Sequence, residues 1–164
     1  MRTLTLLFLL LLSQGSLKAN ASRNDNDKPG VEVSCILLEN DIRLSHYTVI
    51  LYRDGAVSDT FTVSKARPLY FILDYGHQYA VRHIAEGYRD RVVMIDTHVG
   101  KETAAEYHTF DYQVEMVPAD QPANTICDLP AAVVRYDAKL EAFDYSKTYS
   151  KQVRVKPGQT TVSR

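Results

Sequence analysis

The sequence predicts an all-β protein, an antiparallel two-sheet sandwich of about seven strands with a C-terminal extension that adds a short hairpin and a short helix. Two observations support this prediction. Short runs of β-branched and aromatic residues recur about every ten residues, with turn signals between them, as in small sandwiches and barrels. The segment Glu106–Val117 alternates apolar and polar residues, which is typical of a strand with one buried face.

Residues 31–117 are expected to form the sandwich. Asp54-Gly55 and Glu86-Gly87 favour tight turns between strands, because glycine accepts a positive φ angle. Tyr47–Tyr52 and Val92–Ile95 are apolar on both faces, which indicates central strands. The strands are expected at Val31–Leu38, Tyr47–Arg53, Val57–Ser64, Leu69–Leu73, Gln78–Ala85, Arg89–Asp96 and Glu106–Val117.

Residues 118–155 are expected to form a C-terminal extension that packs on or beside the sandwich. Ala131–Tyr136 and Ala142–Tyr145 predict a short hairpin. Ser146 is a candidate cap for a short helix through Val153, because a serine side chain accepts hydrogen bonds from the first free amides of a helix. Residues 156–164 are expected to fray.

Residues 1–21 are predicted to be a cleavable signal peptide. Arg2 precedes the apolar run Leu4–Leu12, and Ala19-Asn20-Ala21 matches the small-residue pattern before a cut. The alternative, a membrane anchor, needs about 20 apolar residues, and this run is far shorter. We therefore expect an exported protein, periplasmic or secreted, that keeps no membrane span after cleavage and starts with a flexible leader at residues 22–30.

Length and charge narrow the classes of partner. Removal of residues 1–21 leaves 143 of the 164 residues, which suits one domain, and 17 basic against 20 acidic side chains, a net charge of −3. A charge so close to zero gives no indication of binding to nucleic acid or an anionic membrane.

Cys35 and Cys127 are the two cysteines of the chain. In an oxidising compartment they are candidates for a disulfide bond, and the alternative is a pair of inert thiols. Neither lies in a Cys-x-x-Cys motif, and neither has a basic neighbour that would stabilise a thiolate.

No catalytic or metal-binding motif is found in the sequence. The five histidines lack the spacing of metal ligands on a helix or strand, and Pro29 and Ile36 occupy positions where a calcium loop needs ligands. The Gly-x-Ser-x-Gly motif of hydrolases is missing. We therefore expect no enzymatic activity, no metal and no cofactor.

The stretch from Val31 to Asp96 resembles the carboxypeptidase regulatory-like family of transthyretin-like β-sandwiches, in a small exported protein of Bacteroidetes type. The motifs that carry the resemblance are Thr48-Val49-Ile50-Leu51-Tyr52, Asp54-Gly55, Thr60-Phe61-Thr62-Val63, Tyr75-Gly76 with Tyr79, and Glu86-Gly87-Tyr88. The segment Lys65–Tyr70 departs from the family, which often has a glycine-containing turn there. The resemblance implies a spacer or docking module without catalytic residues of its own.

The expected function is therefore a non-enzymatic structural or protein-interaction module of the cell envelope, whose partner is another envelope or secreted protein. An edge strand of such a sandwich can pair with another chain, and the C-terminal tail is a candidate for the added strand or for its regulator. The alternative is a carbohydrate-binding module in which Tyr107, Tyr145 and Tyr149 form an exposed aromatic platform for a glycan.

Overall fold

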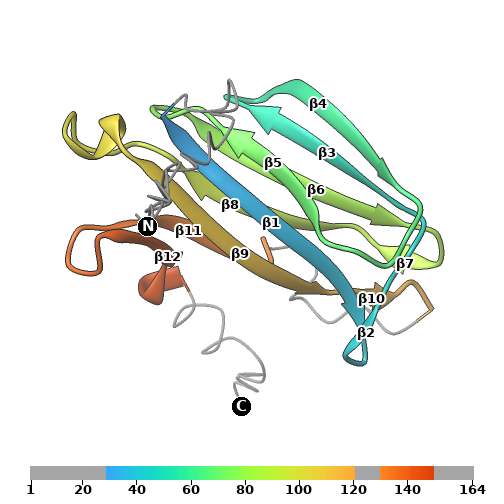
Figure 1. Ribbon diagram of the computed structural model, residues 1–164. Helices are drawn as coiled ribbons and strands as arrows, with labels where there is room; N and C mark the ends of the chain where they lie inside the picture. The colour runs from blue at the N-terminus through green and yellow to red at the C-terminus, as the bar shows by residue number, and fades with distance from the viewer. Residues whose placement is uncertain (1–28, 121–129, 150–164) are drawn as a thin grey trace, which may run out of the picture.

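The computed structural model describes residues 29–120 and 130–149 and shows a sandwich of two β-sheets (Figure 1). The larger sheet has the strand order β12-β11-β8-β6-β3-β4. In the smaller sheet β1 lies between β5 and β9, and the short β2 pairs with the end of β1. The strands are β1 (Gly30–Glu39), β2 (Ile42–Arg43), β3 (Tyr47–Arg53), β4 (Ala56–Val63), β5 (Leu69–Leu73), β6 (Gln78–Ala85), β7 (Tyr88–Arg89), β8 (Arg91–Asp96), β9 (Tyr107–Glu115), β10 (Val117–Pro118), β11 (Ala132–Asp137) and β12 (Ala142–Tyr145), with one 3-10 turn at Thr103–Ala105.

The all-β sandwich predicted from the sequence is confirmed, but its sheets are mixed. The β1–β9 and β8–β11 pairs are parallel, whereas every other pair is antiparallel. Parallel neighbours need long connections, so their pairing leaves no local signal comparable to a hairpin turn. The antiparallel expectation was therefore correct for every strand pair except β1–β9 and β8–β11.

The predicted strand Arg89–Asp96 is divided in two. β7 ends at Arg89, Asp90 belongs to no strand, and β8 starts at Arg91. The Asp90 carboxylate accepts a hydrogen bond from Nε of Arg82 at 2.8 Å. β7 pairs with β10 in a separate ribbon, while β8 continues the larger sheet.

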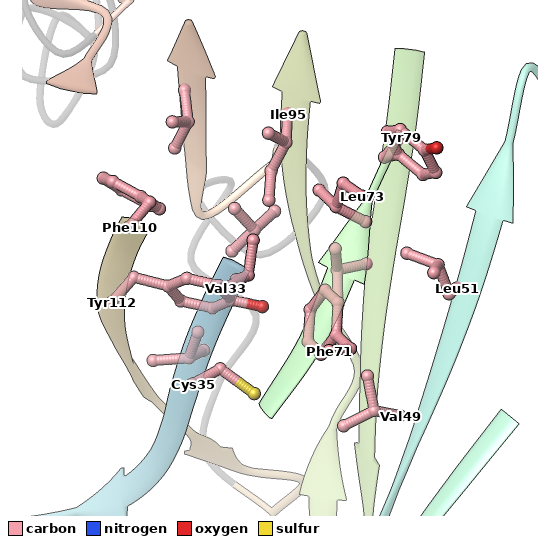
Figure 2. Packing of buried hydrophobic residues seen from close by; sticks show 14 of the residues in the cluster. Val33, Cys35, Val49, Leu51, Phe71, Leu73, Tyr79, Ile95, Phe110 and Tyr112 are labelled. Atoms are coloured by element: carbon pink, nitrogen blue, oxygen red, sulfur yellow. The ribbon is translucent and has the colours of Figure 1, made fainter. Parts of the chain in front are cut away.

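The hydrophobic core fills the space between the two sheets. Alternate residues of each strand face inward, so β1 contributes Val31, Val33, Cys35 and Leu37, all with no exposed surface. Figure 2 shows side chains of β1, β5 and β9 meeting those of β3, β6 and β8. The face of β9 expected to be buried is the face that packs into this core, with Phe110, Tyr112, Val114 and Met116 buried.

The turn between β3 and β4 is the hairpin expected at Asp54-Gly55. Both residues have positive φ angles, 50° and 85°, as a two-residue turn of this hand requires. The Asp54 side chain also accepts hydrogen bonds from the backbone amide of Gln78 at 2.9 Å and from Nδ1 of His77 at 2.6 Å. These contacts lower the pKa of Asp54, with the Gln78 amide as the largest cause.

The C-terminal hairpin continues the larger sheet, because β11 pairs with β8 and β12 pairs with β11. Val134 and Phe143 bring apolar surface into the core. The expected capping role of Ser146 is confirmed, since its Oγ accepts a hydrogen bond from the backbone amide of Tyr149 at 3.4 Å, and residues 147–149 are helical. The rest of the expected helix, through Val153, lies outside the described residues.

Candidate interaction site

The two lateral edges of the sandwich differ in how they are closed. On one side, aromatic rings bridge β9 and β12, with ring centroids 5.5 Å apart for Phe110 and Tyr145 and 5.8 Å apart for His108 and Phe143. On the other side, β4 and β5 are the edge strands of the two sheets. Between them lies a groove of about 500 Å³, which we call the edge groove.

Strands of both sheets form the edge groove. Its apolar base includes Leu51 from β3, Phe61 from β4 and Phe71 from β5. The Phe61 and Phe71 rings are stacked, with their centroids 5.6 Å apart. Leu51 and Phe71 both extend into the core in Figure 2. The aromatic stack therefore joins the two sheets at the point where neither sheet continues.

The pairing of β4 with β3 explains why a charged residue lies in this groove. Phe61 pairs with Val49, and Asp59 pairs with Leu51. Because directly paired residues share a face of the sheet, Asp59 lies on the same inward face as these buried side chains. Most residues of β4 are exposed, since no further strand covers it.

The edge groove carries more negative than positive charge. Glu32, Asp59 and Asp74 line it together with one cation, Arg53. Nη1 of Arg53 lies 3.4 Å from Oδ2 of Asp74, an ion pair that is partly exposed. In the described part of the chain Asp59 has no ion-pair partner; its carboxylate accepts a hydrogen bond from the amide of Thr60 at 2.7 Å. The groove is therefore suited to a ligand that brings a cation.

Tyr79 of β6 also lines the edge groove. Its hydroxyl oxygen accepts a hydrogen bond from the backbone amide of Asp74 at 3.1 Å. Burial raises the pKa of Tyr79, so the hydroxyl stays neutral at physiological pH. This contact fixes the start of the β5–β6 turn beside the Arg53–Asp74 pair.

The structure places Tyr107, Tyr145 and Tyr149, the predicted aromatic platform, in three different settings. Tyr107 is exposed and donates its hydroxyl proton to Glu32, a hydrogen bond that raises the pKa of Tyr107 to about 12. Tyr145 is exposed at the β12 edge. Tyr149 is partly buried and donates to the carbonyl oxygen of Pro130. No ring-to-ring contact joins these three tyrosines, all of which are among the described residues.

Sequence reasoning missed the exposed apolar residues of β5. Tyr70 and Ile72 are 60% and 42% exposed on its outer face, and both line the edge groove. The available signal was the run Leu69–Leu73, which is apolar on both faces. Such a run usually indicates a central strand, yet β5 is an edge strand. An apolar outer face on an edge strand is typical of an interaction surface.

Cys35 lies in the core beside a buried polar network. Nδ1 of His83 is 3.1 Å from the carbonyl oxygen of Arg91, which can only accept, so this nitrogen carries the proton. Nε2 then accepts from the hydroxyl of Tyr112 at 3.0 Å, and Tyr112 also hydrogen-bonds with Cys35. Figure 2 shows Tyr112 and Cys35 pointing into the core between the sheets. Cys127 lies outside the described residues, so the Cys35–Cys127 disulfide stays a prediction.

We expect the thiol of Cys35 to be protected from reagents in the native protein. Burial, only partly offset by the Tyr112 hydrogen bond, raises the pKa of the Cys35 thiol from 9.0 to about 11. This rise alone reduces the thiolate fraction about 100-fold at pH 8. In a Cys127→Ser variant, labelling by a chromogenic disulfide reagent is therefore expected to be at least about 100-fold slower in buffer than in denaturant. Equal rates would contradict the buried position, and the intact mass of the unmodified chain under non-reducing conditions tests the disulfide.

No three histidine, cysteine, aspartate or glutamate side chains within residues 29–120 and 130–149 are grouped so that they could hold a metal ion. The Asp54–His77 and Asp96–His98 contacts, at 2.6 and 2.7 Å, are separate pairs. Over the same residues, no helix has the length and apolar character needed to cross a membrane. The signal peptide expected at residues 1–21 and the leader to residue 28 lie outside the described residues.

Comparisons with known proteins give a limited result. No family model matches the sequence, and no curated protein matches it. The crystal structure of GBS52, the minor pilin of the Gram-positive pathogen Streptococcus agalactiae, is similar, with a TM-score of 0.35 and 12% sequence identity over 58% of this chain and 47% of the pilin. A likeness at this level does not identify a shared function.

Proposed function

We propose that this protein is a non-enzymatic, exported β-sandwich module of the carboxypeptidase regulatory-like type that binds another polypeptide along its open β4/β5 edge. The observation that carries the proposal is the edge groove, in which an aromatic base and unbalanced carboxylates lie beside an exposed edge strand. The partner is another envelope or secreted protein that offers an extended segment.

The recognition mode that suits this edge is the addition of a strand. In the described chain β4 pairs on one side only, with β3, so the backbone groups along its other side are available to an incoming strand. Main-chain hydrogen bonds of this kind supply affinity, and pockets for alternate side chains supply specificity. Here Phe61 and Asp59 provide one apolar and one acidic position on the inward face.

A glycan platform is not favoured over polypeptide binding. The hydroxyl of Tyr107 donates to Glu32, and that of Tyr149 donates to a backbone carbonyl. These contacts orient the two rings within the protein, and neither ring is in contact with the ring of Tyr145. The exposed aromatic and apolar groups that do lie together, Tyr70 and Ile72, border the edge groove.

Synthetic peptides test the proposal. We expect a ten-residue peptide that carries lysine and valine in turn at every second position, with threonine between them, to bind, because one face then offers both a cation for Asp59 and an apolar group for Phe61. The matching peptide with glutamate in place of lysine is expected not to bind, because the groove carries excess negative charge. The Asp59→Lys variant is expected to weaken binding of the lysine peptide at least about tenfold. The control is Glu86→Lys, the same charge change in the exposed β6–β7 turn. Titration followed by amide chemical shifts locates the site; shifts confined to strands other than β4 and β5 would reject it.

A further inference from the structure

The chain itself contains a segment whose chemistry matches the edge groove. Residues 151–156 read Lys-Gln-Val-Arg-Val-Lys, so Val153 and Val155 alternate with polar residues, and Pro157 follows. A proline ends strand pairing because it has no amide proton to donate. The alternation is that of a strand with one apolar face, and three of its six residues are basic. These residues lie outside the described part of the structure.

We propose that residues 151–155 of one copy of this protein bind as an added strand along β4 of a second copy, so that the helix stops before Lys151 and does not continue through Val153. This inference rests on the proposed function and names the polypeptide that occupies the edge. Charge complementarity carries it, because the groove holds the carboxylates of Glu32, Asp59 and Asp74 against a single cation. The segment contributes Lys151 on the same face as its two valines.

Parallel pairing with β4 gives one register that satisfies every inward position. Asp59, Phe61 and Val63 share the inward face of β4, since they pair with the buried Leu51, Val49 and Tyr47. In this register Lys151 lies beside Asp59, Val153 beside Phe61 and Val155 beside Val63. Arg154 and Lys156 then point outward to water, as does Thr62 of β4. The antiparallel arrangement in which Val153 lies beside Phe61 would instead put Lys151 next to Val63 and Val155 next to Asp59.

The sheet order requires that the added strand come from a second copy. The tail follows β12, at one edge of the larger sheet, whereas β4 is at the opposite edge. Five strand spacings separate the two, about 24 Å. Lys151 is two residues beyond Tyr149, and two residues reach at most about 7 Å. The tail cannot place Lys151 beside Asp59 of its own chain, so the contact joins different surfaces of two copies and can be repeated head to tail.

A symmetric contact between two β4 strands is disfavoured by charge. Asp59 is the one charged residue of Ala56–Val63. Pairing of two such strands would bring the two Asp59 carboxylates near each other with no cation from either strand, and like charges on facing strands are destabilising. The basic tail removes this conflict, which is the reason we assign the edge to the tail.

Sedimentation of the exported form, residues 22–164, tests this assignment. We expect concentration-dependent self-association that Lys151→Glu weakens at least about tenfold. Lys156→Glu, the same change on the outward face of the tail, is the matched control and is expected to change the association less than about threefold. Asp59→Lys is expected to abolish association alone, whereas an equal mixture of the Lys151→Glu and Asp59→Lys chains is expected to associate again, because each tail then meets a groove of opposite charge.

Two results would overturn the tail assignment. One is a monomer at all concentrations up to about 1 mM together with no binding of a synthetic peptide of residues 150–164. The other is equal weakening by Lys151→Glu and Lys156→Glu with no recovery in the mixture. If the lysine–valine peptide still binds at β4 in either case, the edge is a polypeptide site with a different occupant, and the proposed function stands. If neither peptide binds, both proposals fail.

Discussion

Acidification from pH 6.5 to pH 4 is expected to lower the free energy of unfolding by about 3 kcal/mol through His83 alone. Burial lowers the pKa of His83 to about 4 in the folded protein, against 6.5 for an unperturbed histidine. Below pH 6.5 the unfolded chain therefore binds a proton at this position that the folded chain does not. The contribution to stability is complete above pH 6.5, declines as the pH falls, and levels off below about pH 4.

The hydrogen bond between His83 and Tyr112 also requires the neutral form of the His83 ring. Nε2 of His83 accepts the hydroxyl proton of Tyr112, and a protonated ring has no acceptor to offer. Urea unfolding at a series of pH values measures the slope. A His83→Gln variant has no titrating group at this position and is expected to be less stable than the wild type at pH 7. Its free energy of unfolding is expected to fall less steeply between pH 6.5 and pH 4, because the contribution of His83 is gone. His46→Asn, a substitution of an exposed histidine outside this network, is the control. An unchanged slope in His83→Gln would refute the assignment.

Phe143→Ala is expected to lower the free energy of unfolding by about 3–5 kcal/mol. Phe143 is 5% exposed. The centroid of its ring lies 5.8 Å from that of the His108 ring and 5.6 Å from that of the Tyr136 ring. Removal of the ring leaves a cavity where the C-terminal hairpin meets β9. Because β11 pairs directly with β8, we expect this loss to affect the whole sandwich in a single cooperative transition.

The matched control for this substitution is Leu140→Ala in the same hairpin. Leu140 is 54% exposed between β11 and β12, so its truncation is expected to change the free energy of unfolding by less than about 0.5 kcal/mol. Chemical denaturation followed by circular dichroism compares the two variants. If Phe143→Ala caused a separate early transition and left the main one unchanged, the hairpin would be an independent appendage.

Local patterns in the sequence predicted most of the strands. Tyr47–Arg53, Leu69–Leu73, Gln78–Ala85 and Ala142–Tyr145 are strands with the predicted bounds. Each is a short run of β-branched, aromatic or alternating residues next to a clear turn, so neighbouring residues determine it. The break at Asp90 was not predicted. The Asp90 carboxylate accepts a hydrogen bond from Arg82 of β6, and no local pattern in the sequence indicates a contact between these two residues.

The candidate site was much harder to predict. The edge groove combines residues of five strands, β1, β3, β4, β5 and β6, or of the turns beside them, and no spacing in the sequence shows that these meet. The exposed positions of Tyr70 and Ile72 depend on the edge position of β5, which follows from the sheet order. The sequence alone indicated that an edge strand of the sandwich could pair with the C-terminal tail. It did not identify which strand forms that edge or in which register the tail would pair with it.

The parallel contact between β1 and β9 has a consequence for how the protein acquires its fold. Gly30 at the start of β1 lies next to Tyr107 at the start of β9, so this contact closes a long stretch of chain. Contacts between remote segments slow folding, because the entropy of the intervening chain is lost before the contact stabilises anything. Until β9 arrives, β1 is itself an edge strand, and the inward row Val31, Val33, Cys35 and Leu37 lacks one of its neighbours. A nascent or truncated chain that ends before residue 107 would therefore present β1 as an unpaired apolar edge strand, which favours aggregation.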